Sequence, residues 1–163
     1  METILLENIR IGHLLVDQLN DVTILFVITK DGLRLRKYSL LTNQKLCFLE
    51  ELLLKSSEIP DKNWKVNQVE LMTKTVSCLF ITNKKLVIFF QKEIIVTTHR
   101  SVLKIPLARC HRFHTSHLCA ASMDPYCTWD HQYQRCIFSM HSSSKHFRQS
   151  LTCPILNITS RTD

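Results

Sequence analysis

Cysteine is the residue type whose spacing in this sequence points most directly to chemistry. Five of the seven cysteines in the 163-residue chain fall between positions 110 and 153. Within that stretch Cys110 and Cys127 are 17 residues apart, and so are Cys119 and Cys136. So dense a group is typical of a secreted module held by disulfides, because a short segment cannot bury much apolar area.

A metal site is the alternative chemistry for this stretch, because histidines lie between its first cysteines. The candidate ligands are Cys110, His111, His114, His117 and Cys119. Structural zinc sites use ligands in paired short spacings such as Cys-x2-Cys, and the sequence contains no such pair. We therefore predict disulfides, with no metal ion and no cofactor.

A turn and a large aromatic side chain complete the cysteine-rich stretch. Asp124-Pro125-Tyr126 is a turn signal, because proline fixes φ and aspartate can bond its own backbone. Trp129 follows Cys127 by two residues. A large ring packed beside a crosslink can serve as the core of so small a module.

These features resemble the junction in semaphorins between the last strand of the sema β-propeller and the plexin-semaphorin-integrin (PSI) module. The matching runs are Pro-Leu-Ala-Arg-Cys at 106–110 and Asp-Pro-Tyr-Cys-Thr-Trp at 124–129. Upstream, Phe-Leu-Glu-Glu at 48–51 is similar to a blade strand of the family. The sequence departs from the family at Ser116, where a cysteine is usual.

The resemblance implies two disulfides and a small core for the module. The implied bonds are Cys110–Cys127 and Cys119–Cys136, and the implied core residues are Asp124, Pro125, Tyr126 and Trp129. The family partner of Cys153 would stand at position 116, so we expect Cys153 to be unpaired or to pair outside the module. For Cys47 and Cys78 the alternatives are buried free thiols or a bond between neighbouring strands.

Residues 1–107 have the pattern of an all-β domain, with short apolar runs separated by turns. The clearest strand is Val22–Thr29, followed by the hairpin signal Asp31-Gly32 and an alternating strand at 33–38. Residues 47–54 fit a helix or a strand, and their place after a hairpin favours a strand. A second set is predicted at 66–73, 76–81, 86–90, 94–98 and 102–107.

These strands fit two four-stranded units of the size of propeller blades. We therefore predict an all-β fold in three parts. About two blades of a sema-type propeller span 1–107, a PSI module spans 108–154, and a polar tail spans 155–163. Asn157-Ile-Thr159 is an N-glycosylation acceptor if the chain is secreted.

The formal net charge of +7 favours anionic partners. Lys30, Arg34, Arg36 and Lys37 form a basic strand region, and Arg34 and Arg36 share one face by the period of two. Glycosaminoglycan binding of the heparan type is one reading of this face, and a solvated strand face is the other. No aromatic residues interleave with these charges as a base-stacking platform requires, so we predict no nucleic acid partner.

The cysteines require an oxidising compartment, but the first ten residues show no secretory signal. Glu2, Glu7 and Arg10 interrupt the apolar run that a signal needs. No run approaches the roughly 18 apolar residues of a membrane span. We therefore expect the chain to be the C-terminal piece of a longer extracellular protein, either secreted or the ectodomain of a membrane protein.

No nucleophile elbow, metalloprotease motif or phosphate loop is present, so we predict a protein that is not an enzyme. The resemblance implies a guidance ligand that binds a plexin receptor through propeller blades this chain lacks. The alternatives are a receptor of the plexin or scatter-factor receptor type and a basic glycosaminoglycan-binding module. Two blades alone leave open sheet edges, so we expect association with another chain, including a second copy.

Overall fold

The computed structural model describes residues 10–19, 22–40, 46–54, 64–76, 89–139 and 153. The chain divides into two compact units, one made of residues 1–56 and 110–163 and the other of residues 57–109. Strands dominate both units, as the sequence predicts, and helices are short. In the part of the chain that the structure describes, no helix is long and apolar enough to cross a membrane.

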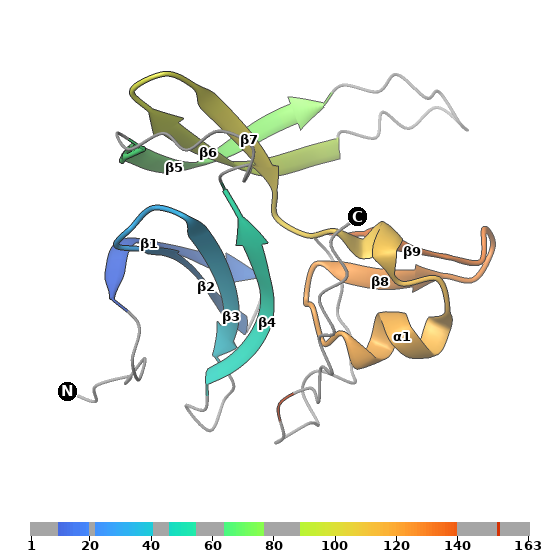
Figure 1. The fold of residues 1–163 in the computed structure, drawn as a ribbon. Coiled ribbons are helices and arrows are strands. Elements are labelled where there is room, and N and C mark those ends of the chain that lie inside the picture. Colours follow the sequence, from blue (N-terminus) through green and yellow to red (C-terminus); the bar gives the residue numbers. More distant parts are fainter. Residues whose placement is uncertain are drawn as a thin grey trace. The chain divides into compact units, whose positions relative to one another are not determined.

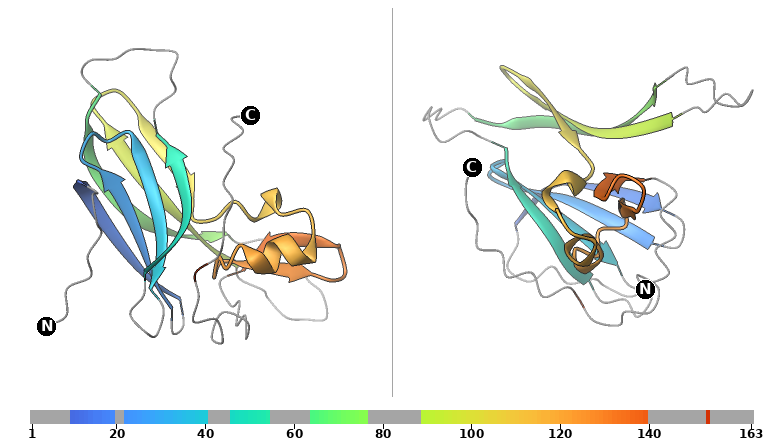
Figure 2. Two further views of the ribbon diagram at one scale, coloured as in Figure 1. Left: turned by 60° about the horizontal axis from the view of Figure 1, so that its bottom comes forward. Right: turned by 90° about the vertical axis from the view of Figure 1, so that its right-hand side faces the viewer.

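The first unit is built on a four-stranded antiparallel sheet with the strand order β1-β2-β3-β4 (Figure 1). The strands are β1 (Ile11–Leu19), β2 (Val22–Thr29), β3 (Arg34–Leu40) and β4 (Leu46–Leu53). Figure 2 shows the four strands, coloured blue to cyan, as one twisted sheet. The choice of a strand over a helix at 47–54 is confirmed, whereas β1 was not among the predicted strands.

Both faces of this sheet are covered at its centre, because residues 24–28 of β2 are all buried. One face carries Leu25, Val27 and Tyr38, which form an apolar cluster with two β4 residues, Leu46 and Phe48. The rings of Tyr38 and Phe48 meet edge to face at 5.6 Å. The other face carries the cysteine-rich module.

The predicted hairpin between β2 and β3 turns at Asp31-Gly32. Gly32 has a φ of 71°, which glycine adopts without steric cost, and its N–H donates to the Thr29 carbonyl at 2.8 Å. The Asp31 carboxylate accepts from the Thr29 hydroxyl at 2.5 Å and from the Leu33 N–H at 2.9 Å. These hydrogen bonds, the one from Thr29 first, hold the pKa of Asp31 below its ordinary value.

The cysteine-rich module also belongs to the first unit. It consists of a 3-10 turn η1 (Cys110–Arg112), a short helix α1 (Ser116–Ala121) and a hairpin of β8 (Cys127–Asp130) and β9 (Arg135–Phe138). Thr115 caps α1, because its hydroxyl accepts from the Leu118 N–H at 3.1 Å.

The second unit contains a three-stranded antiparallel sheet in the order β5-β6-β7. Its strands are β5 (Val66–Val76), β6 (Phe89–Thr98) and β7 (Val102–Pro106). The separate strands predicted at 86–90 and 94–98 were wrong, because β6 runs without a break from residue 89 to 98. Lys92 and Glu93 lie on opposite faces of β6 and are both only half-buried, so these polar side chains do not interrupt the strand.

Several predictions fall on residues that the structure does not describe. These are most of the hairpin predicted at 76–81 and 86–90, the polar tail at 155–163, Asn157 and Cys78. The predicted four-stranded second unit is accordingly represented by three strands among the described residues.

Candidate functional site: the sheet face that carries the cysteine-rich module

The face of the sheet that carries the module is set by alternation along the strands. The register places Phe26 of β2 opposite Lys37 of β3, and Lys37 opposite Glu50 of β4. Asp17 of β1 is opposite Ile24 of β2, two residues from Phe26. Because side chains two residues apart share a face, Asp17, Phe26, Lys37 and Glu50 all belong to the module-bearing face.

A buried ion pair joins this face to the module. Lys37 Nζ lies 2.5 Å from Asp124 Oδ2, and the side chains are only 3% and 8% exposed. The ammonium group also lies 4.6 Å from the centre of the Tyr126 ring and 5.8 Å from that of Phe26. The Asp124 carboxylate and the faces of two rings therefore help to satisfy the cation, as a buried charge requires.

Tyr126 makes the second buried link. Its side chain is fully buried, its ring stacks against Phe26 at 6.5 Å and Phe138 at 5.7 Å, and its hydroxyl donates to Asp17 Oδ2. Burial is the largest cause that raises the pKa of Tyr126 far above its ordinary value, and the hydrogen bond to the Asp17 carboxylate adds to it. Tyr126 therefore acts as a neutral donor at any physiological pH.

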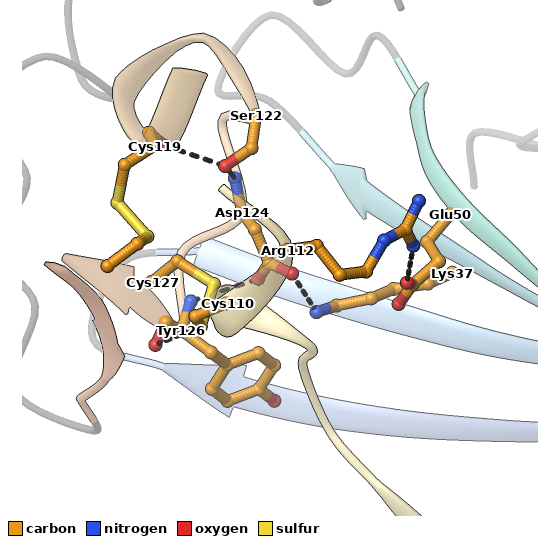
Figure 3. The surroundings of a disulfide bond; sticks show 10 residues. Lys37, Glu50, Cys110, Arg112, Cys119, Ser122, Asp124, Tyr126 and Cys127 are labelled. Carbon is orange, nitrogen blue, oxygen red and sulfur yellow. Dashed lines mark hydrogen bonds and ion pairs between the residues drawn. A yellow bond between two sulfur atoms is a disulfide. The ribbon is translucent and has the colours of Figure 1, made fainter. Parts of the chain in front are cut away.

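Asp124 is held in place by its own turn, as Figure 3 shows. Its Oδ1 accepts from the Tyr126 N–H at 3.1 Å, which leaves Oδ2 for Lys37. The Asp124 N–H donates to the Ser122 hydroxyl at 3.3 Å, and that hydroxyl donates to the Cys119 carbonyl at 2.7 Å. The turn predicted from Asp-Pro-Tyr thus aims a carboxylate and a phenol at the same sheet face.

An exposed ion pair lies beside the buried one. Arg112 Nη1 in η1 lies 2.7 Å from Glu50 Oε1 in β4, with 47% of the arginine side chain exposed. The two ion pairs differ in electrostatic interaction energy, because solvent screens the charges of an exposed pair and screens those of a buried pair only weakly.

Three disulfides crosslink the first unit. The module contains Cys110–Cys127 and Cys119–Cys136, the pairs that the resemblance implies. The Sγ atoms of Cys110, Cys127 and Cys136 lie within 4.8 Å of one another, close enough to hold a metal ion. Each of these sulfurs is already bonded to another sulfur, however, so none is available as the thiolate that zinc binds.

The third disulfide joins Cys153 to Cys47 of β4, with 5.1 Å between the Cα atoms. Val22 and Met123 pack against Cys47 beside Cys153. The partner of Cys153 therefore lies outside the module, which was one of the two expectations. Cys47 bonds across the unit rather than to a neighbouring strand.

Comparisons with known proteins agree with this architecture. The model of the PSI family, the plexin repeat, matches residues 109–154. Over 160 residues, 94% of the chain, the identity is 28% to Semaphorin-5B and 30% to Semaphorin-5A, both of Mus musculus. This chain belongs to the semaphorin family. Semaphorin 5c of Drosophila melanogaster is 38% identical over 64 residues, which are 37% of the chain and 6% of that protein.

The semaphorin chain spans about 13% of the length of the mouse relatives that it matches along most of its sequence. Family membership and the disulfide-bonded PSI module make it part of an extracellular protein.

The predicted site residues of this semaphorin chain fall into different environments. Asp124, Pro125 and Tyr126 are buried, and Tyr126 is the fully buried ring of the module. Trp129, expected as the core ring, is only half-buried and pairs across the hairpin with Cys136.

The basic strand region does not form one charged surface. Arg34 and Arg36 do share a face, and both bind the Glu51 carboxylate at 2.6 Å. Lys37 lies on the opposite face and is buried, so its assignment as a glycosaminoglycan contact is wrong. The only sequence feature that indicates burial of Lys37 is its position between Leu35 and Ser39, which both lie on the buried face of β3.

Sequence reasoning also missed the sheet's other contributions to the site. Asp17 and Phe26 were not singled out, because their partner Tyr126 is about a hundred residues away in the chain. The one sequence feature that could have drawn attention to Asp17 is that this aspartate stands among the alternating apolar residues of β1, where a charged residue is unusual.

Proposed function

We propose that this chain is part of a semaphorin-type guidance ligand, a non-enzymatic extracellular signal that binds a plexin-type receptor and directs cell or axon movement. Family membership and the disulfide-bonded PSI module support this role. By resemblance, the plexin-facing surface lies in propeller blades that precede this stretch. We therefore assign no receptor contact to the described residues.

The contribution we propose for the described residues is mechanical: they fix the direction in which the PSI module leaves the sheet. The observation that carries this proposal is the buried link from Lys37 to Asp124 and from Tyr126 to Asp17. A buried pair works in one geometry only, because a displaced partner leaves an uncompensated charge in an apolar site. The junction should therefore behave as a rigid spacer.

The test uses the longer secreted ectodomain that contains this chain. Binding to cells that express single plexins is measured first, followed by growth-cone collapse or cell contraction. We expect saturable binding to at least one plexin, and binding to none of them would overturn the guidance-ligand proposal.

The mechanical part is tested with Lys37→Met/Asp124→Asn in the same ectodomain. We expect plexin binding to be retained and the collapse response to fall, because the receptor contacts lie elsewhere and the module's direction is no longer fixed. The matched control is Arg34→Ala/Arg36→Ala, which removes two charges from the opposite face of the same strand. An equal loss of response in both variants would contradict a specific role for the junction.

A further inference from the structure

The six disulfide-bonded cysteines differ in how easily solvent reaches them. Five are buried, with at most 5% of each residue exposed: Cys47, Cys110, Cys119, Cys127 and Cys136. The sixth, Cys153, is half-buried. Each bond inside the module thus joins two buried cysteines, whereas the bond between β4 and Cys153 joins a buried cysteine to a half-buried one.

This difference matters for thiol–disulfide exchange. A thiolate must reach one of the two sulfurs and attack it, so the rate depends on access as well as on the acidity of the leaving thiol. In the folded protein each of the four module cysteines is at most 5% exposed, which hinders attack by a thiolate. The half-buried Cys153 is the more accessible residue, and attack on it would make Cys47 the leaving sulfur.

We propose that the Cys47–Cys153 bond is a site of thiol–disulfide exchange in the folded protein. The reactant it takes is an extracellular dithiol reductant, and the bonds Cys110–Cys127 and Cys119–Cys136 remain closed. The site is a modification site rather than a catalytic one, because the protein's own cysteines are the groups that are reduced.

The chemistry balances with the dithiol alone. One thiolate of the reductant attacks Cys153 Sγ, the bond to Cys47 breaks, and the Cys47 thiolate takes up a proton. The second thiol of the reductant, as thiolate, then attacks the mixed disulfide, and Cys153 leaves and is protonated. Two electrons and two protons pass to the cysteine pair, and the reductant becomes a disulfide.

Reduction would change how the module is attached without dismantling it. The Lys37–Asp124 pair, the Tyr126–Asp17 hydrogen bond and the Arg112–Glu50 pair do not involve Cys47 or Cys153. The module bonds keep its own shape. Reduction therefore converts a covalent attachment into a non-covalent one that can open and close.

The test is differential alkylation of the oxidised 163-residue chain. Thiols that are free at the start are blocked, the protein is exposed to graded dithiothreitol at neutral pH, and new thiols are trapped with a second reagent and assigned by peptide mapping. We expect Cys47 and Cys153 to be trapped about tenfold faster, or more, than the four module cysteines. Equal rates, or earlier opening of a module bond, would overturn the proposal.

The same experiment in guanidinium chloride shows whether folding causes the selectivity. We expect the three bonds to open at similar rates once the chain is unfolded. A preference for Cys47–Cys153 that persists in denaturant would show that exposure in the fold is not the cause, and it would also overturn the proposal.

Hydrogen exchange on the selectively reduced protein tests the consequence. Amides around Tyr126 should exchange faster than in the oxidised protein but slower than in the unfolded chain, because the buried links remain. The variant Cys47→Ser/Cys153→Ser should show the same exchange without any reductant. Unchanged exchange in both samples would contradict the loosened attachment, and so would complete loss of protection. Plexin binding is not part of this readout, so its outcome is separate from that of the proposed function.

Discussion

Lys37 is the residue with the most demanding environment in the first unit. Its side chain is nearly inaccessible, and its ammonium group contacts the Asp124 carboxylate and the Tyr126 and Phe26 rings. A buried pair need not stabilise a protein more than apolar residues would, but removal of one partner strands the other charge. The single and double substitutions should therefore behave very differently.

Lys37→Met should lower the free energy of unfolding by about 3–5 kcal/mol, because the Asp124 carboxylate would be left buried without a cation. Adding Asp124→Asn should recover much of that loss, since the amide can still accept from the Tyr126 N–H. Urea unfolding of the four proteins in the cycle measures the coupling. Arg112→Ala is the matched control, and its loss should stay below about 1 kcal/mol because that pair is exposed. Equal losses for Lys37→Met and Arg112→Ala would contradict the argument.

Tyr126 should make stability depend on alkaline pH. Its pKa in the folded protein is raised above the ordinary value of 10.0, first by burial and then by the Asp17 hydrogen bond. The unfolded chain therefore ionises first, so the contribution of Tyr126 is complete below pH 10 and falls as pH rises above 10. Tyr126→Phe removes this dependence, and it also removes a buried hydrogen bond worth about 1–3 kcal/mol at neutral pH. Urea midpoints of both proteins from pH 8 to pH 11 should converge at the alkaline end, and parallel curves would disprove the assignment.

At the scale of the elements, the β2–β3 hairpin fixes which side chains share a face. Its turn needs the positive φ of Gly32, and a one-residue slip of register would move Lys37 to the wrong side of the sheet. Gly32→Ala should cost about 1 kcal/mol, because a side chain at φ 71° is strained. Thermal unfolding compares this variant with Lys30→Ala, an exposed change next to the same turn that should have little effect. A Gly32→Ala protein as stable as the parent would show that the turn adopts another conformation.

Strand β1 is the edge of the four-stranded sheet and carries exposed apolar side chains. Leu14 is 48% exposed and Val16 is 56% exposed on the face opposite Asp17. An edge strand of this kind invites pairing with another chain unless charges oppose it. We expect the 163-residue chain expressed alone to self-associate and Leu14→Lys/Val16→Lys to reduce this, as measured by sedimentation. A monomeric parent chain at tens of micromolar would contradict this expectation.

At the scale of the whole molecule, the first unit is made from the two ends of the chain. Residues 57–109, which form the other unit, separate the sheet from the PSI module in the sequence. The Cys47–Cys153 bond crosslinks the chain on the two sides of this insertion, over a separation of 106 residues. In the chain-entropy picture such a crosslink stabilises mainly by restricting the unfolded chain, and the effect grows slowly with loop length.

Cys47→Ser/Cys153→Ser should therefore lower the free energy of unfolding of the first unit by about 5 kcal/mol, against about 3 kcal/mol for loss of either module bond. Guanidinium unfolding followed by hydrogen exchange on peptides from β2 and β8 measures the first unit separately from the second. A change below about 1 kcal/mol would show that the unfolded chain is already held together by other means.

Features that depend on neighbouring residues could be predicted from the amino-acid sequence. The β2 strand, the Asp31-Gly32 turn, the Asp-Pro-Tyr turn and the cysteine-rich module all follow from propensities and spacings over a few residues or from a local family resemblance. The semaphorin family was recognisable for the same reason. Periodicity also placed Arg34 and Arg36 on one face, although it did not reveal their shared partner Glu51.

Contacts between residues far apart in the chain became known only from the folded structure. The sequence indicates a surface position for Lys37, but in the structure Lys37 pairs with Asp124, which is 87 residues later in the chain. Tyr126 likewise donates a hydrogen bond to Asp17, which is 109 residues earlier. The disulfide partner of Cys47 could not be predicted either, because the residues next to Cys47 in the chain carry no information about Cys153. Local sequence limits the conformation of each segment, but burial and pairing depend on which faces pack together, and packing is a property of the folded chain as a whole.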